Sequence, residues 1–327
     1  MSAPPDTAML KVENLVVDLK TPRGVLHAVR GISFEVDRGD TLCIVGESGC
    51  GKSMTSLALM NLLPRNATRS ARSITFDGID LTNLDHSGMN ALRGNRIAMI
   101  FQEPMTALNP AYTIGNQMCE VYLRHKGASM ADAEARAVEL LGKVGIGNAR
   151  ERLGQYPHQL SGGLRQRVMI AMALMCGPEL IIADEPTTAL DVTIQAQILR
   201  LLIDLARELG LALILITHDL GLVARIATRV AVMYAGEIVE EGAVADLFHA
   251  PRHPYTRGLI DCIPVPGKTR RGDKLGAIPG VVPSLVGTLT GCAFRSRCVH
   301  AVEACAGDIP WRHNANGHAA RCVMEGA

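Results

Sequence analysis

The chain has 327 residues and an almost balanced charge, with 33 Lys and Arg residues against 32 Asp and Glu residues. This balance and an aromatic content of 3% argue against a nucleic-acid-binding protein, which normally carries a basic excess and stacking aromatics. The most apolar run, residues 168–176, is far shorter than the roughly 20 residues of a transmembrane helix, so we expect no membrane span.

Short runs that alternate apolar and polar residues fill positions 10–36 and predict antiparallel strands. Residues 41–45 form a continuous apolar run, as expected of a strand that is buried on both faces. A helical pattern follows at 53–63 and stops at Pro64. The beginning of the chain therefore predicts strands, then a glycine-rich turn and a helix.

The remaining sequence predicts an α/β fold. Strands are expected at 73–81, 96–101, 180–183 and 212–216, a hairpin at 230–241, and helices at 131–144 and between the last two of these strands. Strands that alternate with helices favour a parallel sheet with right-handed crossovers. Beyond residue 245 Pro and Gly become frequent, so we expect one domain at 1–245, with an inserted helical subdomain at about 104–163, and an extension at 246–327.

The turn between the predicted strand at 41–45 and the helix fits the pattern G-x-x-x-x-G-K-[ST] of a phosphate-binding loop, or P-loop. Glycines in this position let backbone N–H groups point at phosphate oxygens. We expect Lys52 to reach the β- and γ-phosphates and Ser53 to offer its hydroxyl to Mg²⁺. The whole run is predicted to bind nucleotide: Gly46, Glu47, Ser48, Gly49, Cys50, Gly51, Lys52 and Ser53.

An acidic pair, Asp184 and Glu185, follows the predicted strand at 180–183. Ligands bind at the carboxyl ends of strands in parallel sheets, so both carboxylates are placed where a nucleotide would lie. We expect Asp184 to hold Mg²⁺ through water and Glu185 to polarise the water that attacks the γ-phosphate. An exposed acidic pair at a strand end is common, and the P-loop is what favours the catalytic interpretation.

The octamer Leu160-Ser-Gly-Gly-Leu-Arg-Gln-Arg167 matches the LSGGxxQR signature of the ATP-binding cassette (ABC) family. With the P-loop before it and the acidic pair after it, the sequence is identified as a member of this family. The resemblance implies a P-loop NTPase fold with a RecA-like parallel-sheet core, an antiparallel β subdomain and an inserted helical subdomain, here followed by a small Cys-rich extension. It also implies ATP hydrolysis, with Glu185 as general base.

The same resemblance assigns roles to further residues. Gln102 is similar to the glutamine that contacts Mg²⁺ and the attacking water, and His218 to the histidine that contacts the γ-phosphate. In this family the signature segment completes the ATP site of a partner cassette, so a second ABC ATPase subunit, identical or related, is implied. The residues implied to complete the partner's site are Ser161, Gly162 and Gly163. Gln166 of the signature and Asp191, which is similar to the family's D-loop aspartate, are also expected to bind the nucleotide.

Two positions depart from the family or carry a distinctive side chain. Where the family usually has an aromatic ring that stacks on adenine, this chain has Leu19, so we expect an apolar contact and weaker base recognition. Cys50 lies in the P-loop near a helix N-terminus, where thiol pKa values tend to fall. We therefore expect a reactive thiol whose alkylation blocks ATP binding.

The segments Phe101-Gln-Glu-Pro-Met-Thr-Ala-Leu-Asn-Pro110 and His253-Pro-Tyr-Thr-Arg-Gly-Leu259 resemble the ATPases of oligopeptide, dipeptide and nickel importers. This implies a motor at the cytoplasmic face of the inner membrane, bound to two transmembrane permease subunits and served by an extracytoplasmic solute-binding protein. Oligopeptides or dipeptides are the expected cargo. The alternatives are nickel or another solute, or a cytosolic ABC ATPase that transports nothing.

Nine cysteines are present, and the absence of a recognisable secretory leader in the first residues predicts a reducing compartment without disulfides. Four of them are clustered near the end of the chain: Cys292, Cys298, Cys305 and Cys322. Clustered thiols favour a metal site, and the absence of a tight C-x₂₋₄-C pair favours iron–sulfur over zinc. The resemblance implies a [4Fe–4S] cluster, and reduced free thiols are the alternative.

Overall fold

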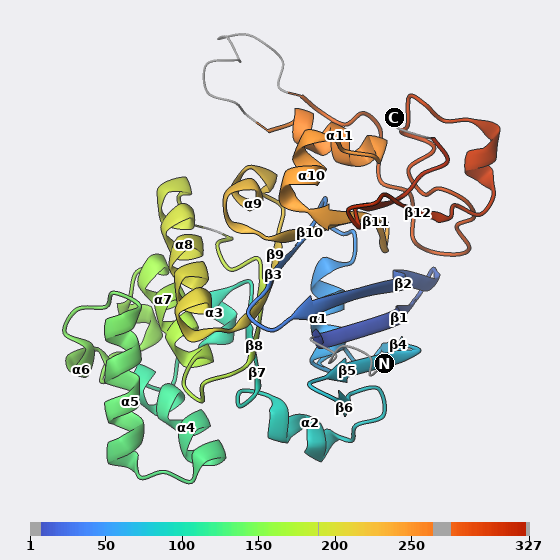
Figure 1. Cartoon of the computed structure of the whole chain (residues 1–327). Helices are drawn as coiled ribbons and strands as arrows, with labels where there is room; N and C mark the ends of the chain where they lie inside the picture. The colour runs from blue at the N-terminus through green and yellow to red at the C-terminus, as the bar shows by residue number, and fades with distance from the viewer. Residues whose placement is uncertain (1–7, 189, 264–275, 325–327) are drawn as a thin grey trace, which may run out of the picture. The chain divides into compact units, whose positions relative to one another are not determined.

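The computed structural model describes residues 8–188, 190–263 and 276–324 (Figure 1). Among these, the chain forms two compact units. The P-loop unit contains residues 10–35, 41–82 and the described residues from 217 onward, and the helical unit contains residues 8–9, 36–40 and the described residues of 83–216. The described helices include none that is both long and apolar enough to span a membrane.

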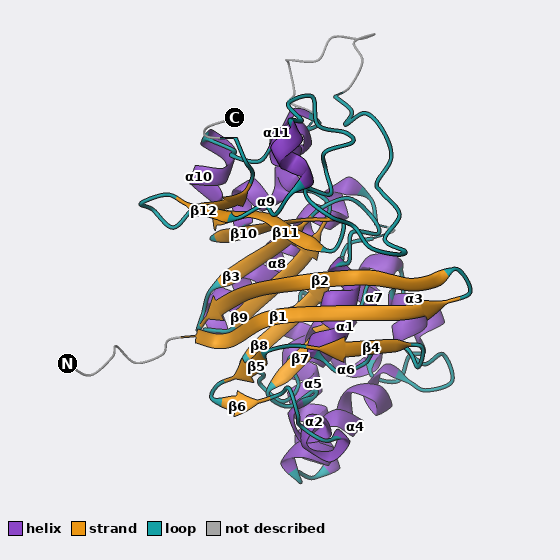
Figure 2. Ribbon diagram, turned by 90° about the vertical axis from the view of Figure 1, so that its right-hand side faces the viewer, coloured by secondary structure: helices purple, strands orange, loops and turns teal. Residues whose placement is uncertain are grey.

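The P-loop unit begins with two long strands, β1 (Ala8–Thr21) and β2 (Gly24–Asp37), which lie side by side in Figure 2. Strand β1 also pairs with β4 (Ala67–Ser70) and β5 (Ser73–Phe76), and β5 pairs with β6 (Ile79–Asp80), all antiparallel. The antiparallel strands predicted near the N-terminus are therefore confirmed. The strand predicted at 73–81 is interrupted because Asp77 and Gly78 both adopt positive φ, which turns the chain back on itself.

A second sheet in this unit contains β3 (Thr41–Val45), whose five residues are all buried. Strand β10 (Arg229–Tyr234) pairs with β3 in parallel and with β11 (Glu237–Ala243) antiparallel. The chain's C-terminal part adds two short strands to the edge of β11, first β13 (Ala319–Arg321) and then β12 (Trp311–His313). The extension is thus continuous with the sheet that carries the P-loop.

Four described α-helices of this unit come before or after these strands in the sequence. Helix α1 (Lys52–Leu59) follows the P-loop and ends earlier than predicted, because the chain turns at Met60 before it reaches Pro64. Helix α9 (Leu220–Ile226) packs against α10 (Val244–His249) and α11 (Pro254–Asp261), and α10 also contacts β10 and β11. Beyond α11, the described part of the extension has only one short 3₁₀ helix, Glu303–Ala306, besides β12 and β13.

The helical unit contains three parallel strands, β7 (Ile97–Ile100), β8 (Leu180–Asp184) and β9 (Ala212–Thr217). Every residue of β8 and β9 is buried, as their continuous apolar sequences predict. The connection from β8 to β9 is α8 (Val192–Leu209), and α2 (His86–Leu92) precedes β7. The parallel α/β class predicted from the sequence is confirmed in this unit.

Between β7 and β8 the chain is almost entirely helical (Figure 1). Helix α5 (Met130–Lys143) matches the predicted one and begins at a capping box made by Ser129 and Asp132. It packs on α4 (Ile114–Lys126) and on α7 (Gly162–Ala173). The shorter elements are α3 (Pro104–Ala107), α6 (Ala149–Arg152) and the 3₁₀ helix Pro157–Gln159.

Candidate nucleotide-binding site

The P-loop turns from β3 into α1 with no room for side chains at two of its glycines. A Cβ atom on Gly46 would lie 2.1 Å from the carbonyl oxygen of Met233 in β10, and one on Gly51 would lie 2.3 Å from that of Ala28 in β2. Gly51 also has φ +106°, which residues with a side chain rarely adopt. The backbone of the loop is therefore pressed against two strands, and the glycine spacing of the motif is a steric requirement.

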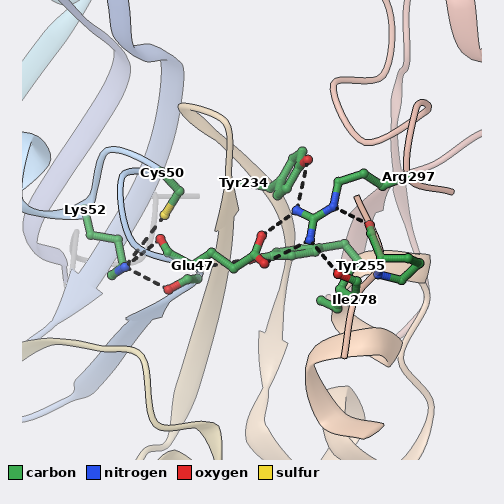
Figure 3. A network of polar contacts seen from close by, with 9 residues as sticks. Glu47, Cys50, Lys52, Tyr234, Tyr255, Ile278 and Arg297 are labelled. Atoms are coloured by element: carbon green, nitrogen blue, oxygen red, sulfur yellow. Dashed lines mark hydrogen bonds and ion pairs between the residues drawn. The ribbon is translucent and has the colours of Figure 1, made fainter. Parts of the chain in front are cut away.

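Lys52 lies over the loop that it follows. Its side chain is buried, and Nζ donates hydrogen bonds to the carbonyl oxygens of Gly46 at 2.8 Å and Glu47 at 3.0 Å (Figure 3). An ammonium group held in this position is directed at the centre of the turn, where the motif predicts phosphate oxygens. Ser53, the next residue, is in the first turn of α1 and offers a hydroxyl for a cation.

The pKa of the Cys50 thiol differs from the prediction that was based on its position in the P-loop. It is 1% exposed, and burial raises the pKa of its thiol although the charge of nearby Lys52 acts in the opposite direction. The prediction of a lowered pKa is therefore wrong, because loss of solvent outweighs the charge and hydrogen bonds of Lys52. Alkylation of this thiol is expected to be slow.

In the helical unit, the carboxyl end of β8 presents the acidic pair. Asp184 is buried as the last residue of the strand, and Glu185 adopts a left-handed backbone conformation with φ +43°. The Glu185 carboxylate accepts hydrogen bonds from Gln102 Nε2 at 3.4 Å and from Thr188 Oγ1 at 3.1 Å. Gln102 and Glu185 are 83 residues apart in the sequence but lie together in the structure. The left-handed backbone of Glu185 is a strained conformation, and such conformations are frequent at functional sites.

The signature segment begins α7. Ser161 caps this helix, since its side chain accepts a hydrogen bond from Leu164 N–H, and both Ser161 and Gly162 are exposed. Gln166 points inward, and its side-chain nitrogen has no hydrogen-bond partner among the described residues. The exposed start of α7 is available to a partner molecule, whereas Gln166 is not on that surface.

Three further residues of the predicted site lie in loops or on a strand. Asp191 is exposed as the N-cap of α8, and His218 is exposed directly after β9. Leu19 is half-buried near the end of β1. The contacts of these three residues with ATP stay predictions.

Two residues that the sequence did not assign to the site contact the P-loop directly (Figure 3). The guanidinium of Arg297 forms a bidentate ion pair with the carboxylate of Glu47, with nitrogen–oxygen distances of 2.7 and 3.0 Å. The hydroxyl of Tyr255 accepts a hydrogen bond from Glu47 N–H at 2.9 Å. Tyr255 belongs to the 253–259 segment. The sequence analysis used this segment only to recognise the family and did not assign it a contact with the P-loop.

The four late cysteines line one small cavity of about 10 Å³, roughly the space of a single water molecule. Burial, together with the nearby thiols, raises the pKa of Cys292 to about 11. Among the described residues, however, no group of three or more His, Cys, Asp or Glu side chains is arranged to hold a metal ion. The four cysteines share one cavity but are not arranged around a metal, and a cluster at this place stays a prediction.

The fold and the loop define the class of protein: a P-loop ATPase built as an ABC cassette. Two solved structures agree, each with about three-tenths of its residues identical to this chain. A dimeric bacterial ABC transporter cassette has a TM-score of 0.65 and 29% identity, covering 72% of this chain and 99% of its own. A dimeric post-hydrolysis cassette bound to ADP and Pi has a TM-score of 0.63 with the same identity and coverage.

Family models and relatives narrow the class. Residues 29–188 match the ABC transporter model, and residues 239–305 match the model of the oligopeptide/dipeptide transporter C-terminal region. A putative peptide import ATP-binding protein of Brucella abortus is 51% identical over 96% of both chains. The oligopeptide transport ATP-binding protein OppD of Salmonella typhimurium is 48% identical over 97% of this chain and 94% of its own. The chain belongs to the ABC transporter ATP-binding family and carries the C-terminal region typical of its oligopeptide/dipeptide branch.

Proposed function

We propose that this chain is the ATP-hydrolysing subunit of an importer of oligopeptides or dipeptides. The observation that carries the proposal is identity of about one half, over nearly the whole length, to relatives named as peptide import ATP-binding proteins. The dipeptide transport ATP-binding protein DppD of Bacillus subtilis, 48% identical over 97% of this chain, supports the same cargo class. The match of residues 239–305 to the oligopeptide/dipeptide region adds independent support.

The proposed partners follow from this role. Two transmembrane permease subunits would supply the membrane path, and an extracytoplasmic solute-binding protein would deliver the peptide. A second cassette, identical or related, would complete each ATP site, with Ser161, Gly162 and Gly163 facing the partner's nucleotide. The chain would then lie peripherally on the cytoplasmic face of the membrane.

The proposed chemistry is attack of water on the γ-phosphate of ATP. Lys52 and the P-loop amides bind the phosphates and offset their charge. Glu185 accepts the proton of the attacking water, and Gln102, which is hydrogen-bonded to Glu185, orients that water. His218 contacts the γ-phosphate from the loop after β9.

Mg²⁺ is the expected metal of this reaction. The hydroxyl of Ser53 and the carboxylate of Asp184 are the hard oxygen ligands that Mg²⁺ prefers, and Gln102 adds an amide oxygen. The ion would supply charge neutralisation at the β- and γ-phosphates. Ser53 lies in the first turn of α1, Asp184 ends β8, and Gln102 lies in the loop after β7.

We further propose that Cys292, Cys298, Cys305 and Cys322 hold a [4Fe–4S] cluster. The support is that all four line one cavity and that thiolates are the usual ligands of such clusters. The cavity as it stands is far smaller than a cluster, so the loops that carry the cysteines would have to move apart around it. Iron and acid-labile sulfide in protein purified without oxygen would support this proposal. Zinc without iron, or neither metal, would contradict it.

The proposed transport function is tested by purifying the full-length chain from its native membrane and identifying the proteins that remain bound. Permease subunits and a solute-binding protein are expected, and cells that lack the chain should lose uptake of labelled dipeptides or oligopeptides. Retained peptide uptake with loss of nickel uptake would favour the nickel alternative. Absence of any membrane partner would favour a cytosolic ATPase.

A further inference from the structure

The second residue of the P-loop, Glu47, is held at three of its polar groups. Its carboxylate pairs with Arg297, its N–H donates to the Tyr255 hydroxyl, and its carbonyl accepts from Lys52. The peptide group between Gly46 and Glu47 consists of the Gly46 carbonyl and the Glu47 N–H. The Gly46 carbonyl also accepts a hydrogen bond from Lys52. Because the C=O and N–H of a trans peptide point in opposite directions, this peptide is fixed between Lys52 on one side and Tyr255 on the other.

Tyr255 is itself rigidly placed. Its side chain is fully buried against Tyr234 and Phe294, with ring centroids 4.6 and 5.4 Å away. Its own N–H donates to Nδ1 of His253, the N-cap of α11. The N–H of His253 in turn donates to the buried carboxylate of Glu240 at 2.8 Å. The 253–259 segment therefore forms a fixed support that ends in a hydroxyl directed at the P-loop.

Arg297 is held equally firmly. Its side chain is 3% exposed, and besides Glu47 its guanidinium donates to the carbonyl oxygens of Pro279 at 2.9 Å and Ile278 at 3.1 Å. It also lies 5.7 Å from the centre of the Tyr234 ring. Arginine matches a carboxylate with two parallel hydrogen bonds, which fixes orientation as well as distance. The carboxylate of Glu47 therefore has one preferred position, on the side away from Lys52 in Figure 3.

We propose that Arg297 and Tyr255 are positioning residues for ATP binding: together they form a clamp by which the C-terminal extension sets the conformation and charge of the P-loop. The proposal rests on the proposed nucleotide binding and is independent of any metal at the cysteines. It gives the 253–259 segment a physical role.

Two effects make the clamp relevant to phosphate binding. The first is geometric, because rotation of the Gly46–Glu47 peptide would redirect backbone groups inside a turn that has to point N–H groups at phosphate oxygens. The second is electrostatic, because a carboxylate in an anion-binding loop repels phosphate unless a cation neutralises it. Arg297 supplies that cation from outside the loop and leaves Lys52 to the nucleotide.

The test is a double-mutant cycle on the full-length chain, with MgADP binding measured by calorimetry. Arg297→Met should weaken MgADP binding by about tenfold, because it leaves the Glu47 carboxylate without its cation. Glu47→Gln should weaken binding by less, because it loses the ion pair that fixes the loop but also removes the negative charge that repels phosphate. The double variant should be no weaker than either single variant. Arg297→Lys should recover part of the affinity, and Arg295→Met, two residues away and exposed, should bind like wild type.

Thermal unfolding without nucleotide separates positioning from stability. A lower unfolding midpoint with wild-type affinity would show that the contact only stabilises the extension, and would overturn the clamp. Multiplicative effects of the two substitutions, or single variants that bind like wild type, would overturn it as well. If the wild-type chain itself bound no MgADP, the proposed ATPase function would fall, and that result is distinct from the others.

Discussion

The P-loop and the carboxyl end of β8 are equally recognisable in the sequence, but their side chains are held by different parts of the chain. Glu185 is held by Thr188, three residues away, and by Gln102, both within the segment that matches the ABC transporter model. Glu47 is held by Tyr255 and Arg297, which are 208 and 250 residues away in the C-terminal region. The carboxylate that we propose as the general base is therefore held by contacts within the cassette, whereas Glu47 of the P-loop is held by contacts from the C-terminal region.

The largest expected effect concerns the carboxylate side of this comparison. Glu185→Gln should lower ATP turnover by about 10²- to 10⁴-fold, because an amide cannot accept the proton of the attacking water. MgATP binding should be unchanged, since the P-loop and its support are intact. Steady-state ATPase rates and equilibrium binding on the same preparation check both statements.

Glu120→Gln is a suitable control for this variant, because Glu120 is an exposed glutamate of α4 with no role in the proposed chemistry. It should hydrolyse ATP like wild type. Equal rates for Glu185→Gln and the control would remove Glu185 from the proposed mechanism.

The next effect concerns the support of the P-loop and its dependence on pH. Full burial lowers the pKa of His253 from its ordinary value of 6.5 to about 4, against the opposing influence of Glu240 and with a smaller lowering by Arg321. A histidine whose folded pKa is depressed contributes stability that is present above pH 6.5 and is lost as the pH falls toward 4. The loss amounts to about 3 kcal/mol across this window, as an order of magnitude.

Chemical unfolding at pH 7 and pH 5 measures this loss. Wild-type protein and the control variant His249→Gln, whose histidine is exposed, should lose stability in parallel. A His253→Gln variant should start less stable and lose less between the two pH values. The same loss in all three proteins would show that His253 is not the titrating group.

The smallest expected effect concerns recognition of the adenine base, which involves neither the P-loop nor Glu185. Leu19→Tyr should strengthen MgATP binding by about 0.5–1.5 kcal/mol if the ring stacks on adenine. The preference for ATP over other nucleoside triphosphates should rise with it. Competition binding against GTP and CTP measures the change, and an unaltered affinity and preference would show that position 19 does not face the base.

Sequence reasoning succeeded where the controlling interactions are local. The buried run at 41–45 and the glycines after it predicted β3, the P-loop and α1, because strand burial and steric exclusion of Cβ atoms act within a few residues. The same holds for β8 with its acidic pair and for the helical spacing at 131–144 that predicted α5.

Sequence reasoning failed where contacts between residues far apart in the sequence determine the environment of a side chain. The lowered pKa predicted for Cys50 is wrong because the folded chain buries the thiol, which the position of Cys50 in the motif did not reveal. The ion pair between Glu47 and Arg297 spans 250 residues, and nothing in either local sequence identifies the other partner. The four cysteines are clustered in sequence and share a cavity, yet their spacing did not determine whether they are arranged around a metal.

The central claim is that binding of the phosphates and activation of water are supported by separate parts of the chain. One measurement tests it most directly: the dissociation constant of MgATP and the maximal turnover, determined together for Glu47→Gln and Glu185→Gln. We expect weaker binding with largely retained maximal turnover for Glu47→Gln, and retained binding with lost turnover for Glu185→Gln. Loss of both properties in each variant, or of neither, would contradict it.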